Sequence, residues 1–185
     1  MTRREFEQTR FTSKEDEWGT PLVLFRTLDE EFHFNLDPCG DRSRLLRADL
    51  ETWTKEDNGL NRSWAGRRVF VNPPYAHIAE WVQKCHAEAE SAEVIVLLIF
   101  SRTDTRYFHE YIYGKAELRF IRGRLKFTNL NNPSLPERPA TFPSMVCIYH
   151  HNKPEPPQCR SIPTVLGSYG LVFDGGYNGG GSCEQ

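Results

Sequence analysis

Four consecutive residues, Asn72-Pro73-Pro74-Tyr75, combine groups that could hold and activate an amine. They directly follow residues 68–71, a short β-branched and aromatic stretch that predicts a strand. The exocyclic amine of a nucleobase is a poor nucleophile, because its lone pair is delocalised into the ring. The amide oxygen of Asn72 and the carbonyl of Pro73 could accept its two hydrogens, while the prolines keep this backbone rigid. The ring of Tyr75 offers a face on which an extruded base could stack.

The same four residues could also form a strand-ending Pro-Pro turn with a structural asparagine. A given tetrapeptide is expected by chance in roughly one chain in a thousand of this length, so we favour the chemical interpretation. With a methyl sulfonium beside the amine, in-line transfer would need positioning more than acid–base catalysis. The segment is therefore interpreted as the centre of a group-transfer site.

Predicted strands and helices alternate around this segment, which indicates an α/β fold with right-handed crossovers. Thr20 is expected to cap a helix that has Pro21 at its first position and ends near Glu31. The apolar run 93–99 is typical of a strand buried on both faces of a parallel sheet. The other predicted elements are strands at 32–37, 116–121, 123–127 and 144–149 and helices at 78–90 and 103–113.

Polar side chains follow three of the predicted strands. Asp37, Asn72 and Ser101 each stand at the point where a strand ends. Ligands of such sheets bind just beyond the carboxyl ends of the strands. We therefore expect these three residues to share one edge of the sheet, and this shared placement is the main structural argument for a site.

The composition bounds the class of protein. The chain has 185 residues, a net charge of −2, 38% hydrophobic and 12% aromatic residues, which suits one folded domain and excludes a uniformly basic nucleic-acid-binding surface. The longest apolar run, 94–100, is too short to span a membrane. The polar N-terminus and five cysteines without a C-x-x-C pair predict a cytoplasmic protein with free thiols and no metal site.

The chain divides by composition into three parts. Residues 1–17 mix both charge signs and are expected to form an N-terminal arm. Residues 18–151 are the predicted catalytic domain, with a probable target-recognition loop at 128–141. Residues 152–185 are a C-terminal extension, rich in glycine and expected to be flexible from about residue 175.

Several segments of residues 12–150 together resemble the phage-type DNA N-6-adenine methyltransferases, the phage Dam family of S-adenosylmethionine-dependent amino-methyltransferases. Their joint order is more specific than any one of them apart from Asn72-Pro73-Pro74-Tyr75. The matching segments are residues 16–21 (D-E-W-G-T-P), 34–39 (F-N-L-D-P-C), 56–60 (E-D-N-G-L) followed by Trp64, 71–75 (V-N-P-P-Y), 97–108, 123–127 (G-R-L-K-F) and 142–144 (F-P-S).

The resemblance implies a compressed, single-domain Rossmann-like class I methyltransferase fold with a mostly parallel central sheet and flanking helices. It implies S-adenosylmethionine as cofactor, DNA as partner and a monomer or weak dimer encoded by a phage or prophage in a bacterial host. Asn72, Pro73, Pro74 and Tyr75 would hold the target adenine. The cofactor would contact Trp18, Thr20, Asp37, Pro38, Cys39 and Asp57, with Asp37 facing its ammonium group and Asp57 its adenine or ribose; Asp49 and Glu51 are further candidates for the ribose hydroxyls.

Each cofactor assignment has a structural alternative. Asp37 could simply form a turn before proline, Thr20 could act only as a helix cap, and Trp18 could be a core residue. The segment after Asp37 also supplies a single glycine, Gly40, where common methyltransferases carry a glycine-rich loop. The cofactor pose is therefore less defined than the target-base pocket.

A local excess of basic residues between 99 and 126 is expected to bind phosphates, so that affinity would fall with salt. An ordinary solvated basic face is the alternative. The loop 128–141 is expected to recognise the base sequence of the DNA target, although it could be a proline-rich connector. The basic residues of the stretch are Arg102, Arg106, Lys115, Arg119, Arg122, Arg124 and Lys126, and the DNA-binding candidates are Arg102, Arg106, Arg122, Arg124, Lys126 and Arg138.

Two other function classes stay open. The same pocket could serve N-methylation of an RNA base or of a protein glutamine, which methylated RNA or protein without methylated DNA would indicate. A catalytically inactive nucleic-acid-binding module of the same fold is the third reading. The intact Asp37 and Asn72 argue against that reading, and calorimetry with S-adenosylmethionine tests it.

Overall fold

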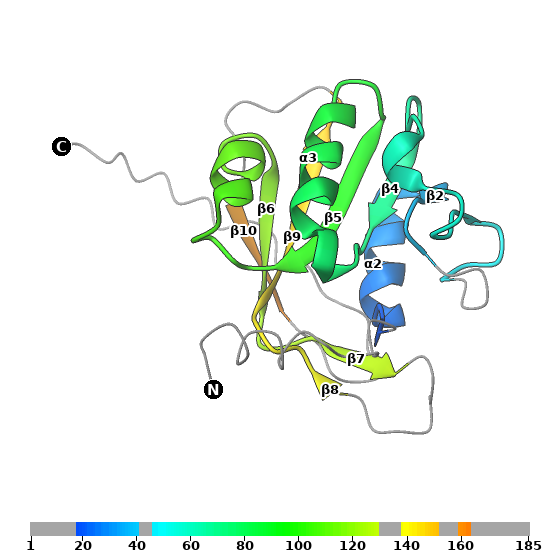
Figure 1. Ribbon diagram of the computed structural model, residues 1–185. Helices are drawn as coiled ribbons and strands as arrows, with labels where there is room; N and C mark the ends of the chain where they lie inside the picture. The colour runs from blue at the N-terminus through cyan, green and yellow to red at the C-terminus, as the bar shows by residue number, and fades with distance from the viewer. Residues whose placement is uncertain (1–17, 41–45, 130–137, 152–158, 164–185) are drawn as a thin grey trace, which may run out of the picture.

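Strand β5 (Val94–Phe100) lies at the centre of the protein in the computed structural model, which describes residues 18–40, 46–129, 138–151 and 159–163 (Figure 1). Its valine and isoleucine side chains favour extended backbone, and nearly all of the strand is buried. Within the described residues β5 belongs to a seven-stranded sheet with the order β10-β6-β9-β5-β4-β2-β3. The other strands of this sheet are β2 (Leu36–Asp37), β3 (Glu51–Thr52), β4 (Arg68–Val71), β6 (Glu117–Arg122), β9 (Ser144–His150) and β10 (Cys159–Pro163).

The sheet is mixed. Strands β3, β2, β4 and β5 run parallel to one another, and β10 runs parallel to β6. Strand β9 runs antiparallel to both β5 and β6. The expectation that the apolar run of β5 belongs to a parallel sheet is therefore right for its β4 side and wrong for its β9 side. An unbroken apolar pattern reports burial on both faces and carries no information about the direction of the neighbouring strand.

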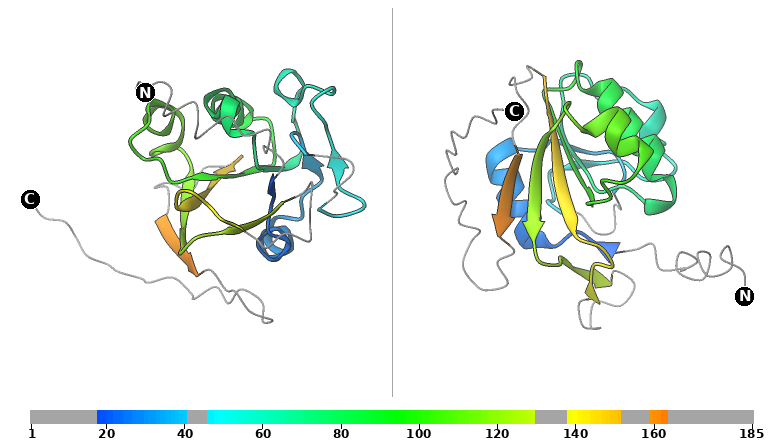
Figure 2. Two further views of the ribbon diagram at one scale, coloured as in Figure 1. Left: turned by 60° about the horizontal axis from the view of Figure 1, so that its bottom comes forward. Right: turned by 90° about the vertical axis from the view of Figure 1, so that its left-hand side faces the viewer.

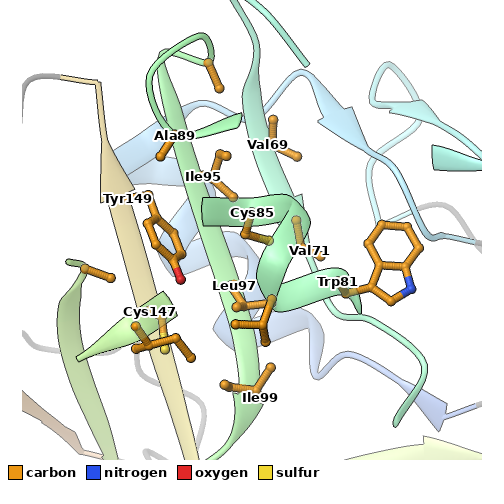
Figure 3. Close-up of a cluster of buried hydrophobic side chains, with 14 of the residues drawn as sticks. Val69, Val71, Trp81, Cys85, Ala89, Ile95, Leu97, Ile99, Cys147 and Tyr149 are labelled. Atoms are coloured by element: carbon orange, nitrogen blue, oxygen red, sulfur yellow. The ribbon is translucent and has the colours of Figure 1, made fainter. Parts of the chain in front are cut away.

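The two faces of the sheet carry separate apolar clusters. Helix α3 (Ile78–Glu88) covers one face, where Trp81, Val82 and Cys85 pack on alternate residues of β4, β5 and β9 (Figure 3). Helix α2 (Leu22–Phe32) covers the other face. Both views in Figure 2 show α2 and α3 on opposite sides of the sheet. Residues next to each other in β5 therefore pack against different layers.

Two expected elements are shorter than predicted. The stretch 103–113 contains a single π-helical turn, η4 (Phe108–Ile112), in which the Tyr113 amide donates to the Phe108 carbonyl at 2.8 Å. The buried residues Phe108 and Ile112 anchor this turn, and Gly114, at φ 68°, ends it. Of the predicted strand 32–37, only β2 forms ladder bonds. None of the helices in the described chain is long and apolar enough to cross a membrane.

A second, three-stranded sheet lies beyond the carboxyl ends of the parallel strands (Figures 1 and 2). It contains β1 (Trp18–Gly19), β7 (Lys126–Asn129) and β8 (Arg138–Pro139). Strands β7 and β8 pair as a hairpin that continues β6 and β9, and Gly123 at φ 85° separates β6 from β7. This bend explains why the predicted strand 123–127 starts later, at Lys126. Strand β1 pairs with the outer side of β7.

A buried ion network joins the opposite end of the sheet to α2. Arg119 is 4% exposed and donates to Glu117 at 2.7 Å and to both carboxylate oxygens of Glu31. His150 Nε2 lies 3.1 Å from the second oxygen of Glu117. Hydrogen bonds from these partners lower the pKa of Glu117 to about 2, against the effect of its burial. Arg119 therefore belongs to the core and is not one of the basic residues available to a phosphate.

We predict that Glu117→Gln destabilises the protein by about 3 kcal/mol at neutral pH. The buried Arg119 guanidinium would then lose one of its two negatively charged partners. The folded pKa lies below the ordinary 4.5, so the stabilisation is complete above pH 4.5 and is lost as the pH falls towards 2. Urea unfolding at pH 7 and pH 3 measures both effects. Glu93→Gln is the matched control, since its pair with Arg68 is exposed and contributes at most about 1 kcal/mol. Equal stability of the two variants at pH 7 would contradict the account.

Candidate functional site

The carboxyl ends of β2 and β4 meet where the strand order of the sheet reverses. From β2 the chain passes to β3 on one side, and β4 then takes the place on the other side of β2. In open α/β sheets such a reversal leaves a crevice in which ligands bind. Asp37 is the last residue of β2, Asn72 follows β4 and Ser101 follows β5. The predicted placement of these three residues at one edge of the sheet is confirmed.

Asp37 is a buried carboxylate at this crevice. It is 7% exposed, and its Oδ1 accepts a hydrogen bond from the Cys39 amide at 3.1 Å. Burial raises the pKa of Asp37 to about 7. A Cβ on Gly40 would lie 2.5 Å from Asp37 Oδ2 and 2.6 Å from Cγ2 of Thr52, so glycine is needed for this close approach. No cationic side chain contacts Asp37 among the described residues, and a buried acceptor of this kind fits the ammonium group of a ligand.

Pro38 and Cys39 directly follow Asp37, and the Cys39 amide bonds its carboxylate. A Cβ on Gly59 would lie 2.1 Å from the Pro38 carbonyl oxygen, so the segment around Gly59 can approach β2 only because it lacks a side chain there. Burial and the neighbouring Asp37 raise the pKa of the Cys39 thiol well above its ordinary value, while a hydrogen bond with the Asn72 backbone opposes the shift. Cys39 thus lies between Asp37 and Asn72.

The side chain of Asn72 is held by Thr20. Its Nδ2 donates to Thr20 Oγ1 at 2.9 Å, and Thr20 is 9% exposed. The expectation that Thr20 caps helix α2 is wrong, because Pro21 occupies the cap position and no side chain there bonds a helix amide. No donor within the described residues reaches Asn72 Oδ1, so this oxygen can accept from a ligand.

The two prolines after Asn72 differ in what their carbonyls do. The Pro74 carbonyl accepts from the His77 amide at 3.2 Å, which begins the 3₁₀ turn η3 (Tyr75–His77). In the described chain the Pro73 carbonyl receives no hydrogen bond. It therefore remains available as the second acceptor that the sequence predicted.

Tyr75 lies against an aromatic residue that sequence reasoning missed. Its ring stacks on Phe100 at a centroid distance of 4.0 Å and an interplanar angle of 10°, and Phe142 lies 5.5 Å beyond Phe100. Burial raises the pKa of the Tyr75 hydroxyl. Only the other ring face of Tyr75 could receive a base while this stack persists. The available signal was that Phe100, like Asn72, stands at the carboxyl end of a predicted strand.

The acidic candidates for ribose contacts are engaged in local structure. Asp57 Oδ2 accepts from the amide and hydroxyl of Thr54 at 2.9 and 3.0 Å, and Oδ1 lies 3.3 Å from Arg62. Glu51, the first residue of β3, accepts from Trp53 Nε1 at 2.8 Å and pairs with Arg67. Asp49 pairs with Arg47 and is exposed. Of Trp18 only the backbone, in β1, is described. No group of three potential metal ligands occurs in the described residues.

The candidate DNA-binding residues separate into three groups. Arg102 and Arg106 form exposed pairs with Asp104 and Glu110. Arg124 donates to the carbonyls of Ala140 and Thr141 and thereby holds the hairpin strands together. Arg122 and Lys126 are exposed, at the end of β6 and at the start of β7. The backbone of Arg138 lies in β8. Most of the predicted loop 128–141 falls outside the described residues. The same holds for the arm 1–17 and for nearly all of the extension after residue 151.

Comparisons with known proteins place the chain in a family. Residues 8–166 match the model of the family described as DNA N-6-adenine-methyltransferase (Dam). The chain is 26% identical over 121 residues to the DNA N-6-adenine-methyltransferase of Haemophilus phage HP1 (strain HP1c1), covering 63% of this chain and 69% of that protein. It is 26% identical over 112 residues to the protein of the same name from Escherichia phage T1, covering 60% of this chain and 46% of that protein. No solved structure matches significantly.

We predict opposite effects of Asp37→Asn on stability and on cofactor binding. The folded pKa of about 7 exceeds the ordinary 3.8, so the wild type loses stability as the pH rises from about 4 to 7. At pH 8 the variant should unfold a few degrees higher, since it avoids a buried charge. Its affinity for S-adenosylmethionine, measured by calorimetry, should fall at least about tenfold. A variant that is less stable at pH 8, or that binds the cofactor as tightly as the wild type does, would contradict the role of Asp37.

Proposed function

Because the chain belongs to the DNA N-6-adenine-methyltransferase (Dam) family, we propose that it transfers a methyl group from S-adenosylmethionine to the N6 amine of adenine in DNA. The observation that carries this proposal is the placement of Asp37 and Asn72 at the ends of neighbouring parallel strands. Asp37 is a buried carboxylate suited to a cation, and Asn72 carries an amide oxygen that can accept a hydrogen bond. The names of both phage relatives support the same activity.

We further propose that the fold is a compressed form of the Rossmann-like class I methyltransferase fold. The parallel strands β3, β2, β4 and β5 and the helices on both faces support this assignment. The reversal of strand order at β2 supports it as well, because it lies where such folds bind their ligands. The antiparallel strand β9 is an addition to the parallel pattern.

The cofactor site is proposed at the end of β2. S-adenosylmethionine, when bound, supplies a methyl group made electrophilic by its sulfonium. Asp37 would accept hydrogen bonds from the ammonium group. These bonds would stabilise the ionised carboxylate, which burial destabilises in the free protein. Pro38 and Cys39 directly follow Asp37 and are proposed to border the same position, while Trp18 and Asp57 stay proposed contacts. Glu51 begins β3 and is bonded to Trp53 and Arg67, so Asp57 stays the acidic candidate.

The target-base site is proposed at Asn72 and Pro73. Two acceptors, the oxygen of the Asn72 amide and the carbonyl of Pro73, would hold the two hydrogens of the adenine N6 amine. Acceptors in this arrangement favour a pyramidal nitrogen, whose lone pair is then directed at the methyl group. Neither acceptor needs to titrate, so the chain contributes positioning and does not need a general base to begin the transfer. Tyr75 would stack on the extruded base with the ring face that Phe100 leaves open.

DNA is proposed to lie across the carboxyl end of the large sheet and the small sheet beyond it. The exposed residues Arg122 and Lys126 are the best placed to reach phosphates, and Arg102 lies after β5 at the same edge. The hairpin β7–β8 contains the ends of the loop 128–141, and we propose that this region recognises the base sequence of the DNA. The protein would act in the phage-infected or prophage-carrying bacterial host as a monomer or weak dimer.

We predict that Asn72→Ala lowers methyl transfer at least a thousandfold, because one of the two amine acceptors is lost and the other cannot orient the base alone. The assay follows labelled methyl groups from S-adenosylmethionine into unmethylated genomic DNA, with mass spectrometry of the nucleosides to identify N6-methyldeoxyadenosine. Asn61→Ala, at the exposed last position of η2 (Gly59–Asn61), is the matched control and should keep wild-type activity. Methylated RNA or protein in place of DNA, or transfer by Asn72→Ala near the wild-type rate, would contradict the proposal.

We also predict that Arg122→Ala and Lys126→Ala each weaken DNA binding by a similar factor on all sequences. Each should reduce the slope of log affinity against log salt by about one, since each removes one phosphate contact. Fluorescence anisotropy with a labelled duplex at several salt concentrations measures both quantities. Lys55→Ala, at an exposed residue near the end of β3, is the control. An unchanged salt slope in both test variants would exclude these residues from the DNA-binding surface.

A further inference from the structure

The hydrogen bond between Asn72 and Thr20 joins two segments that lie 52 residues apart. The sequence assigned Thr20 to capping a helix or to the cofactor, and neither role explains this contact. Thr20 lies directly after β1 and before helix α2, and its hydroxyl is turned towards the end of β4. The bond therefore connects the N-terminal segment to the proposed acceptor of the target amine.

The orientation of the Asn72 amide matters because its two ends have opposite hydrogen-bonding character. Oδ1 accepts hydrogen bonds and Nδ2 donates them. A half-turn about the last side-chain bond would present Nδ2 to the adenine amine, so that two donors would face each other. Torsions of this type are broad and roughly two-fold, so the side chain itself does not select one orientation. In the structure Nδ2 is the donor and the Thr20 hydroxyl the acceptor, which leaves Oδ1 on the opposite side of the amide.

We propose that Thr20 is a positioning residue that holds the Asn72 amide with Oδ1 towards the target amine. The inference rests on the proposed function of Asn72 and adds to it the group that sets its orientation. Thr20 does not touch the reacting atoms and acts through Asn72.

The surroundings of Thr20 make it a rigid support. Gly19 pairs with Thr128 of β7, so the backbone immediately before Thr20 is part of the small sheet. Pro21 restricts the backbone immediately after it. Thr20 itself is buried. The acceptor of the Asn72 amide is thereby fixed from both sides, and one of those sides is the hairpin that carries the loop 128–141.

The test compares Thr20→Val, which keeps the shape and removes the acceptor, with Thr20→Ser, which keeps the hydroxyl. Thr27→Val is the matched control, because Thr27 is a buried threonine of α2 whose hydroxyl bonds only the Val23 carbonyl, at 3.0 Å, among the described residues. We expect Thr20→Val to lower kcat about tenfold, the effect of one hydrogen bond. The cofactor Kd and the KM for DNA should stay within about twofold of wild type. Thr20→Ser and Thr27→Val should keep most of the wild-type kcat.

A second readout does not depend on methyl transfer. In nitrogen-15 NMR spectra, the side-chain amide protons of Asn72, assigned with Asn72→Asp, should shift in Thr20→Val and stay near their wild-type positions in Thr27→Val. An unchanged amide signal and an unchanged kcat in Thr20→Val would overturn the inference. So would a cofactor Kd that rises while kcat at saturating cofactor stays near the wild-type value, since Thr20 would then be a cofactor ligand only. If wild-type protein methylates no DNA, the proposed function fails, and the NMR comparison still decides the Thr20–Asn72 contact.

Discussion

Strand β2 has only two residues, yet its pairing with β4 sets the position of every group in the crevice. Leu36 pairs with Val69, and just before it the Asn35 amide bonds the Arg68 carbonyl at 2.9 Å. Continued from this pair, the register places Asp37 level with Phe70, so Asp37 and Asn72 lie two residues apart along the strand direction at the same end of the sheet. If β2 slipped by one residue against β4, Asp37 and Asn72 would lie on opposite faces of the sheet. The buried core on both faces opposes such a slip, so the apolar layers above and below hold the polar site in register.

The site carries groups that do not favour the stability of the free protein. The buried carboxylate of Asp37 has a raised pKa, and the Asn72 oxygen and Pro73 carbonyl lack donors within the described residues. In a core position each of these would be a defect. In the proposed function these same groups accept hydrogen bonds from an ammonium group and an amine. Stability comes from elsewhere, above all from the apolar clusters and from the buried network of Arg119 with Glu31 and Glu117.

Sequence reasoning predicted what depends on local pattern. The residues of β4, the start of α3 and the shared edge of Asp37, Asn72 and Ser101 follow from β-branched runs, helical spacing and strand ends. It did not predict contacts between distant segments. The bond from Asn72 to Thr20, the stack of Tyr75 on Phe100 and the burial of Arg119 depend on tertiary packing, which a linear pattern does not contain. The antiparallel direction of β9 was also hidden, because a buried strand has the same apolar pattern in either direction.

The central claim is that Asn72 and Pro73 accept the amine of an extruded adenine while Thr20 holds the Asn72 amide. A crystal structure of the protein with S-adenosylhomocysteine and a duplex containing the methylation target tests it most directly. The account predicts an adenine out of the helix, with N6 within hydrogen-bond distance of Asn72 Oδ1 and of the Pro73 carbonyl, and with Nδ2 still bonded to Thr20. An extruded base that contacts neither acceptor, or an Asn72 amide turned so that Nδ2 faces N6, would contradict it.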